Sequence, residues 1–161
     1  MPTDAADRDR IIAYLDAAEG RGPVPVLDPI AIAHLLRETK RIAVVGASSR
    51  PGRPSFGVFR ELLDAGYDCV PVNPFESEVH GRRAHSTLRD AVAATGPVDI
   101  VDVFRRPELC ADHAREAVEV GARALWLQLG VVNWEAAQIA HGAGLLVVMD
   151  RCIAIEVRRI G

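Results

Sequence analysis

The residues best suited to chemistry in this chain follow an apolar run, in the stretch RIAVVGASSRPGRPS at positions 41–55. The run ends at Gly46, the loop after it carries Arg50 and Arg53, and Ser55 can cap a following helix. Free N–H groups and the dipole at the start of a helix attract anions. The pattern predicts a phosphate site, and the alternative is a turn that only joins a strand to a helix. The predicted residues are Gly46, Ala47, Ser48, Arg50, Arg53 and Ser55.

Charge around this turn differs from charge over the whole chain. The net charge is -3, which gives no reason to expect a nucleic-acid partner. Between residues 37 and 53, however, five cations accompany a single acid, Glu38. This excess predicts either a local anion site or an ordinary solvated rim.

The turn also departs from the pattern of dinucleotide enzymes. It lacks G-x-G-x-x-G, because the next glycine after Gly46 is Gly52. NAD enzymes place an acid at the end of their second strand, where it binds the ribose hydroxyls, but Asn73 stands there, followed by Pro74. A neutral amide does not repel a phosphorylated ribose. Asn73 and Pro74 are therefore predicted to lie near such a ribose, or else to be simple turn residues.

Two later strand ends add candidates for the same site. Phe104 and Arg105 follow the third apolar run, where the ring could line an adenine slot and the guanidinium could reach a phosphate. Either residue could equally be structural, since Pro107 suits the first position of a helix. Gln128 and Gly130 follow the fourth run. All four are predicted to border the ligand.

Residues for covalent or metal chemistry are sparse. The five histidines lack metal-ligand spacing, and neither a G-x-S-x-G elbow nor a Walker lysine occurs. No catalytic or metal-binding residue is predicted, and we expect neither hydride transfer nor acyl-CoA ligation from the isolated chain. Asp99 and Asp102 lie on one apolar strand, either as an acid pair or as partners of a neighbouring loop. Arg151 could lower the pKa of the Cys152 thiol, and the alternative is a buried structural thiol.

Alternating strands and helices must position these strand ends. Apolar runs rich in Val and Ile occupy residues 41–45, 67–72, 98–104, 123–129 and 145–149. They are continuously apolar, which indicates burial on both faces. Helix caps or first helical positions between them are expected at Ser55, Ser86, Pro107 and Asn133. This predicts an α/β, Rossmann-like three-layer sandwich with a five-stranded parallel sheet.

Residues 1–37 precede this pattern. Two helices are expected at Asp7–Ala18 and Pro29–Arg37, joined by the linker EGRGPVPVLD. The predicted organisation is a helical extension over residues 1–37 and a ligand-binding domain over residues 38–161. No apolar segment reaches the ~18 residues of a membrane span, and the charged N-terminus lacks a signal-peptide core. A cytoplasmic protein without a membrane partner is expected.

Five ordered motifs resemble the small stand-alone CoA-binding domain family, over about residues 30–161. They are LLRETKRIAVVGASSRPGRPSFGV, GYDCVPVNP, VDIVDVFRRPE, EVGARALWLQLGVVNWEAA and AGLLVVMDRCIAIE. The family is Rossmann-like and similar to the N-terminal CoA-binding domain of the succinyl-CoA synthetase alpha chain. The resemblance implies that the chain binds coenzyme A or an acyl-CoA. The synthetase's phosphohistidine machinery lies outside the matched region, so no ligase activity is implied.

The resemblance also implies how the ligand lies. The family turn S-x-[KR]-P-x-R-x-S matches residues 48–55, and the motifs V-N-P, V-F-R and Q-x-G match residues 72–74, 103–105 and 128–130. Adenosine diphosphate would lie over Gly46–Ser48, with phosphate on Arg50 and Arg53, the ribose near Asn73 and Pro74, and Phe104 and Arg105 closing the adenine side. Departures from the family at His80, His85 and Trp134 could alter the rim of the pocket.

We expect strand order 3-2-1-4-5, with the fourth strand beside the first. In that order Gln128 and Gly130 face the Gly46 turn, and Asp150 lies on the same rim. Two rivals to coenzyme A binding remain: an interaction module with a vestigial nucleotide pocket, and an NAD(P)-dependent oxidoreductase. The missing second glycine and Asn73 argue against the oxidoreductase.

Overall fold

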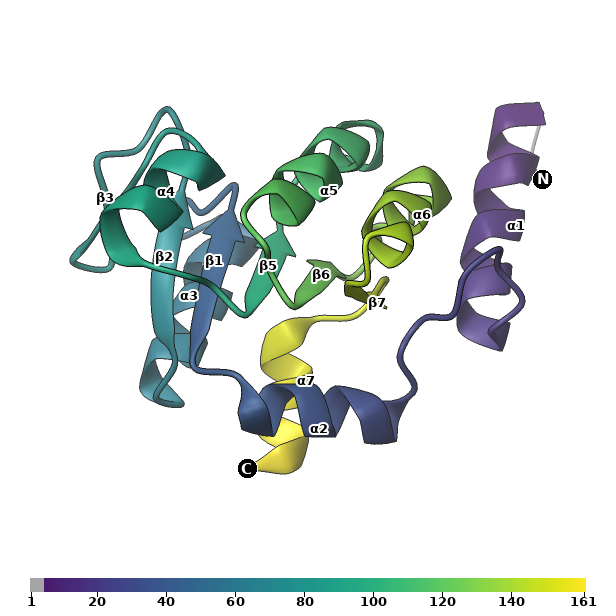
Figure 1. Cartoon of the computed structure of the whole chain (residues 1–161), viewed down its shortest axis with the longest axis horizontal. Coiled ribbons are helices and arrows are strands. Elements are labelled where there is room, and N and C mark those ends of the chain that lie inside the picture. Colours follow the sequence, from purple (N-terminus) through teal and green to yellow (C-terminus); the bar gives the residue numbers. More distant parts are fainter. Residues whose placement is uncertain (1–4) are drawn as a thin grey trace.

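The computed structural model describes residues 5–161 and shows a parallel sheet with helices on both faces (Figure 1). The five strands run in the order β2-β1-β5-β6-β7, and all neighbours are parallel. They are β1 (Arg41–Val45), β2 (Asp68–Val72), β5 (Ile100–Val103), β6 (Ala124–Leu127) and β7 (Leu146–Val148). The predicted Rossmann-like sandwich is confirmed, and all five predicted strands are present.

Each face of the sheet has its own apolar core. One face is covered by α2 (Pro29–Glu38), α3 (Pro54–Asp64) and α7 (Ile153–Ile160), and the other by α4 (Leu88–Thr95), α5 (Cys110–Glu119) and α6 (Trp134–Gly142). Along β1, Val44 packs into the first core and Val45 into the second. Successive side chains point to opposite faces of a strand, so a strand covered on both sides must be apolar throughout.

The predicted strand order 3-2-1-4-5 is wrong. The third strand, β5, lies beside β1, where Val103 is paired with Val45, and the fourth strand, β6, lies beside β5. In right-handed crossovers, the direction in which the chain moves along the sheet decides which face the helix covers. Because α3 and α4 bury their apolar residues in opposite cores, the chain reverses direction after β2. Packing between distant segments decides which face of the sheet each helix covers, and the composition of the strands does not predict this.

Two helices precede the sheet, as predicted: α1 (Ala5–Glu19) and α2. Helix α2 buries Ile32, Leu35 and Leu36, whereas α1 buries no side chain and lies beyond α6 and β7 (Figure 1). The linker between the two helices is tied to the sheet, because the Leu27 N–H donates to the Val147 carbonyl at 2.9 Å. Helix α1 and the linker therefore border the β7 edge of the sheet.

The small hairpin that joins β3 (Glu78–Val79) to β4 (Arg82–Arg83) and the last helix, α7, had no clear signal in the sequence. The 3-10 helix η1 (Pro107–Leu109), which leads into α5, begins at Pro107 as predicted. The predicted cap at Ser86 is wrong by one residue, because the Thr87 hydroxyl accepts from the Asp90 N–H. Asn133 caps α6 as predicted. Within residues 5–161, no helix has the length and apolar character needed to cross a membrane.

Candidate functional site

A pocket of about 660 Å³ opens at the carboxyl ends of β1, β2, β5 and β6, and we call it the Gly46 pocket. Its volume is typical of small-molecule sites, and strand ends in an open parallel sheet are where such ligands bind. Most of the predicted site residues line it: Gly46, Ser48, Arg50, Arg53, Ser55, Asn73, Phe104, Arg105 and Gln128. The fold therefore brings together four strand ends that lie far apart in the sequence.

Three predicted site residues do not line the pocket. Ala47 is fully buried in the core next to the turn. Pro74 is exposed and lies outside the lining. The Gly130 N–H donates to the Asp150 carboxylate at 2.7 Å, which fixes the loop after β6. These residues shape the loops around the pocket.

The glycine at position 46 is required by the fold as well as suited to a ligand. Its φ of +82° lies in the left-handed region, and a Cβ there would come within 2.3 Å of the Phe104 carbonyl oxygen. The Gly46 N–H also donates to the Val72 carbonyl at 2.8 Å. The turn is therefore locked between β2 and the end of β5, which gives the pocket a rigid floor.

Gly46→Ala is expected to lower the free energy of unfolding by about 2 kcal/mol or more, because it adds left-handed strain and a clash with backbone. The matched control is Gly52→Ala, where a Cβ meets nothing within 4 Å. Urea denaturation of the two variants and the parent measures the difference. Equal loss in both variants would contradict the locked turn.

Ser55 acts inside the turn and is not the predicted helix cap. Arg53 occupies the N-cap position of α3 without a side-chain cap, and Pro54 begins the helix. The Ser55 hydroxyl accepts from the Ser48 N–H at 3.1 Å and donates to the Gly46 carbonyl at 3.4 Å. A buried hydroxyl that satisfies two backbone groups holds the loop closed over the start of α3.

Asn73 combines a turn role with a place in the lining. Its Nδ2 donates to the Ala47 carbonyl and its Oδ1 accepts from the Phe75 N–H, both at 2.9 Å. The amide therefore clamps the Gly46 turn to the end of β2. One donor and one acceptor of the amide remain for a ligand, so the turn interpretation and the ribose interpretation are compatible.

Cations at the pocket mouth supply charge for an anionic ligand. Among residues 5–161, no acid lies within ion-pair distance of Arg53 or Arg105, whereas Arg106 pairs with Glu108. One acid, Glu76, also lines the pocket. Hydrogen bonds from the Ser49 side chain and N–H lower the pKa of that carboxyl group, and the Arg50 charge adds to this effect. Two unpaired guanidiniums beside the start of α3 form a suitable phosphate site.

A buried carboxyl group supports the inner wall of the pocket. Asp102 is fully buried, and Gln128 Nε2 donates to its Oδ1 at 2.5 Å, while Oδ2 has no partner. Burial raises the pKa of Asp102 to about 8, against the opposing effect of the Gln128 hydrogen bond. Asp99 instead accepts the Lys40 and Arg41 N–H groups before β1. The two acids are therefore no acid pair, and Asp102 positions Gln128.

The strand order changes the place assigned to Phe104 and Arg105. Because β5 lies between β1 and β6, these residues stand on the side of the pocket that leads to Gln128. The opposite side, at the end of β2, carries Phe75, whose side chain is 90% exposed. Sequence reasoning missed Phe75, although it directly follows Asn73 and Pro74 in the sequence. The structure identifies Phe75 as a candidate, because its exposed aromatic ring lies beside the pocket.

The three positions that depart from the family do not line this pocket. The His80 ring stacks on Phe56 with centroids 4.1 Å apart, and His85 belongs to the loop bridged to Val72. Trp134 packs its ring flat against Gly22 in the linker, where a Cβ would lie 1.8 Å from the ring. The expectation that these residues alter the pocket rim is therefore wrong.

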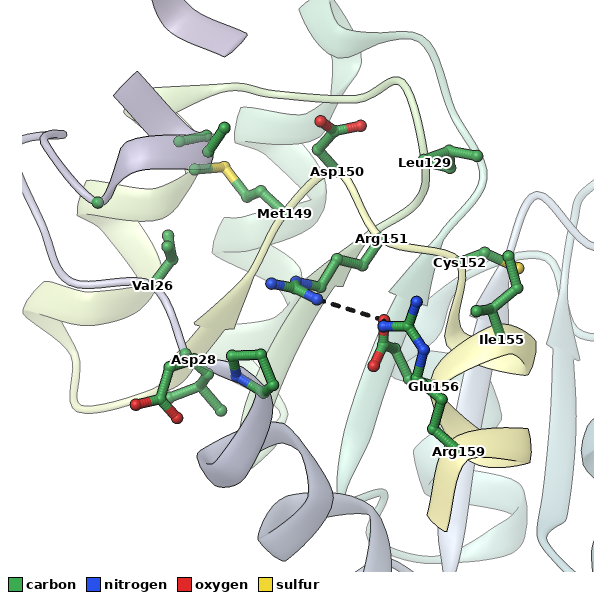
Figure 2. Close-up of a pocket in the computed structure, with 15 residues that line it drawn as sticks. Val26, Asp28, Leu129, Met149, Asp150, Arg151, Cys152, Ile155, Glu156 and Arg159 are labelled. Carbon is green, nitrogen blue, oxygen red and sulfur yellow. Dashed lines mark hydrogen bonds and ion pairs between the residues drawn. The ribbon is translucent and has the colours of Figure 1, made fainter. Parts of the chain in front are cut away.

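The cysteines take two kinds of position. Cys69 and Cys110 are buried, and burial raises the pKa of Cys69 to about 12 and that of Cys110 to about 11. Cys152 is partly exposed at the N-cap of α7. The Arg151 guanidinium pairs with Glu156 and points away from the Cys152 sulfur (Figure 2). The hypothesis that Arg151 activates this thiol therefore has no support in the geometry.

Comparisons with known proteins agree with the fold and the strand-end motifs. The Bacillus subtilis (strain 168) protein YneT is 45% identical over 124 residues, which are 77% of this chain and 90% of that protein. A solved Pyrococcus horikoshii OT3 protein is 36% identical with a TM-score of 0.79, covering 83% of this chain and 92% of its own. A solved Thermus thermophilus protein is 37% identical with a TM-score of 0.77, covering 84% and 100%.

The family match includes all four strand ends around the Gly46 pocket. Residues 40–158 match the family model described as CoA binding domain. This range contains β1 to β7 and most of α7, so it covers the whole sandwich apart from α1 and α2. The chain therefore belongs to the CoA binding domain family.

Proposed function

We propose that the protein binds coenzyme A or an acyl-CoA in the Gly46 pocket. The observation that carries the proposal is the meeting of two unpaired cations, Arg53 and Arg105, with the start of α3 in one pocket at the strand ends. Phosphate groups need such donors, and coenzyme A has more phosphate charge than NAD. Membership of the CoA binding domain family supports this choice of ligand.

The lining suggests how each part of the ligand lies. The pyrophosphate lies over Gly46 and Ser48 and the phosphates contact Arg50 and Arg53, as the motifs predict. The ribose lies near the Asn73 turn. With the observed strand order, the adenine lies against Phe75 at the end of β2, and Arg105 faces the start of the pantetheine arm. Coenzyme A then runs across the rim from β2 toward β6.

We further propose that the isolated chain binds its ligand without transforming it. No nucleophile with an adjacent base lines the Gly46 pocket in the described chain, and Asp102 is buried behind Gln128. We place this binding in the cytoplasm, because buried thiols that remain unpaired are typical of reducing compartments.

Calorimetric titration of the chain with coenzyme A and with NAD tests the proposed ligand. Coenzyme A is expected to bind more tightly, and mass spectrometry of protein purified without denaturation is expected to find it as a co-purifying molecule. Tighter binding of NAD would favour the oxidoreductase. Binding of neither cofactor would favour an interaction module whose nucleotide pocket is vestigial.

Phe75→Ala is expected to weaken coenzyme A binding by about tenfold, because stacking of a base on an aromatic ring contributes ~1–3 kcal/mol. Affinity for 4'-phosphopantetheine, which lacks adenine, should not change. Ile30→Ala serves as the control, since Ile30 is 79% exposed and does not line the pocket. Calorimetric titration of both variants with both ligands measures the change in affinity. An equal loss of affinity for both ligands in Phe75→Ala would show that adenine does not lie against Phe75.

A further inference from the structure

A second cavity, of about 490 Å³, opens at the carboxyl end of β7 between the α1–α2 linker and α7 (Figure 2). We call it the α7 cavity. One face of α7 lines it with Cys152, Ile155, Glu156 and Arg159, at the spacing of successive helical turns. The end of β7 contributes residues 149–151 to the lining. The two cavities therefore open along the same rim of the sheet.

The α7 cavity and the Gly46 pocket share a wall. Leu129, in the loop after β6, lines both cavities, and its side chain is 66% exposed. The loop is fixed on the far side, where both backbone groups of Gly130 are hydrogen-bonded: its N–H donates to the Asp150 carboxylate and its carbonyl accepts from the Tyr14 hydroxyl. Asp150 has a φ of 56°, an uncommon left-handed conformation for a residue other than glycine. The loop after β6, held in place by these hydrogen bonds, thus separates the two cavities at Leu129.

The distance along the rim matches the length of the pantetheine arm. Strands β1, β5, β6 and β7 lie in a row, so three spacings of about 4.8 Å put the end of β7 about 14 Å from the Gly46 turn. The arm has about twelve consecutive bonds, the length of about four extended residues, which reaches about 14 Å. An arm that starts at the Gly46 turn and passes Gln128 and Leu129 therefore ends at the α7 cavity.

The walls of the α7 cavity combine apolar side chains with two arginines. Val26, Leu129, Met149 and Ile155 are among the apolar residues. Beside Ile155 on α7, one oxygen of the buried Glu156 accepts from Arg151 at 3.3 Å and from Arg159 at 2.9 Å. One carboxylate thus serves two guanidiniums, and each guanidinium has several N–H donors left over.

Two further acids line the cavity but face other partners. The Asp28 carboxylate caps α2 by accepting the Ala31 N–H, and the Asp150 carboxylate accepts the Gly130 N–H. Both carboxylates point away from the arginines in Figure 2. Among residues 5–161, the spare donors of Arg151 and Arg159 therefore lack an acceptor inside the cavity, and a ligand carboxylate would supply one.

We propose that the α7 cavity holds the acyl group of an acyl-CoA, and that this acyl group ends in a carboxylate bound by Arg151 and Arg159. The apolar side chains of the lining cover the methylene groups between the thioester and the carboxylate. The proposal rests on coenzyme A binding in the Gly46 pocket. It assigns the chain a dicarboxylic acyl-CoA in place of free coenzyme A.

The test compares two thioesters of equal carbon number, glutaryl-CoA and valeryl-CoA, with free coenzyme A by calorimetric titration. The parent is expected to bind glutaryl-CoA about tenfold more tightly than valeryl-CoA. Arg151→Gln and Arg159→Gln should each reduce that difference, with free coenzyme A unaffected. Arg158→Gln is the matched control, because Arg158 lies on the same helix but pairs with Glu61 outside the cavity.

A steric variant provides a second readout that does not depend on the arginines. Ile155→Trp should fill the cavity and weaken both thioesters by about tenfold, while free coenzyme A binds as before. If the parent binds glutaryl-CoA, valeryl-CoA and coenzyme A equally, the acyl assignment is overturned while the proposed function stands. If coenzyme A itself does not bind, the proposed function fails and the acyl assignment fails with it.

Discussion

Arg53→Ala is expected to weaken coenzyme A binding by about ten- to a hundredfold. A charge-assisted hydrogen bond contributes roughly 1.5–3 kcal/mol, and ~1.4 kcal/mol is a factor of ten in affinity. Arg53 is the N-cap residue of α3, lines the Gly46 pocket and has no ion pair within the described residues. Its guanidinium therefore adds to the N–H groups at the helix start instead of being neutralised by a protein acid. Calorimetric titration with coenzyme A measures the loss.

The control for this variant is Arg89→Ala, on the exposed side of α4. Arg89 forms an ion pair with Glu119 and does not line the Gly46 pocket. Exposed pairs of this kind contribute little to stability, so the control should bind coenzyme A as the parent does. Raising the salt concentration should weaken the parent more than Arg53→Ala, because screening acts on the charge that the variant has lost. Unchanged affinity in Arg53→Ala would reject the phosphate assignment.

Asp102 is expected to make the protein less stable as the pH rises. Burial raises the pKa of its carboxyl from 3.8 to about 8 in the folded chain, and the unfolded chain keeps the ordinary value. Between these two pH values the folded state binds more protons than the unfolded state, so the free energy of unfolding falls as pH rises. The stabilising contribution is complete below pH 4 and is lost by about pH 8. A shift of this size corresponds to a few kcal/mol.

Asp102→Asn should remove this dependence, because an amide can keep the contact with Gln128 without ionising. The variant is expected to be more stable than the parent at pH 9 by a few kcal/mol, and similar to it near pH 4. Asp112→Asn is the control, since the Asp112 side chain is 80% exposed. Urea denaturation at several pH values compares the three proteins. Parallel pH profiles for the parent and Asp102→Asn would contradict this prediction, because they would show that the pKa of Asp102 is the same in the folded and unfolded chains.

Local patterns were enough to predict the five strands of the sheet and the helices between them. The five continuously apolar runs became the five strands, because residues buried on both faces of a sheet must be apolar whatever surrounds them. Asn133 marked the start of α6 correctly, since capping involves only neighbouring residues. The meeting of four strand ends at the Gly46 pocket was also predictable, because parallel strands place all their carboxyl ends on one rim of the sheet.

The sequence by itself therefore determined the strands, their direction and the rim that carries the site. Only the tertiary structure decided the strand order, because each helix chooses a face of the sheet by packing against segments distant in the chain. That order moved Phe104 and Arg105 toward Gln128 and left Phe75 at the opposite side. It also put β5 and β6 between β1 and β7, and at the end of β7 the helix α7 and the α1–α2 linker enclose a second cavity that no short motif encodes.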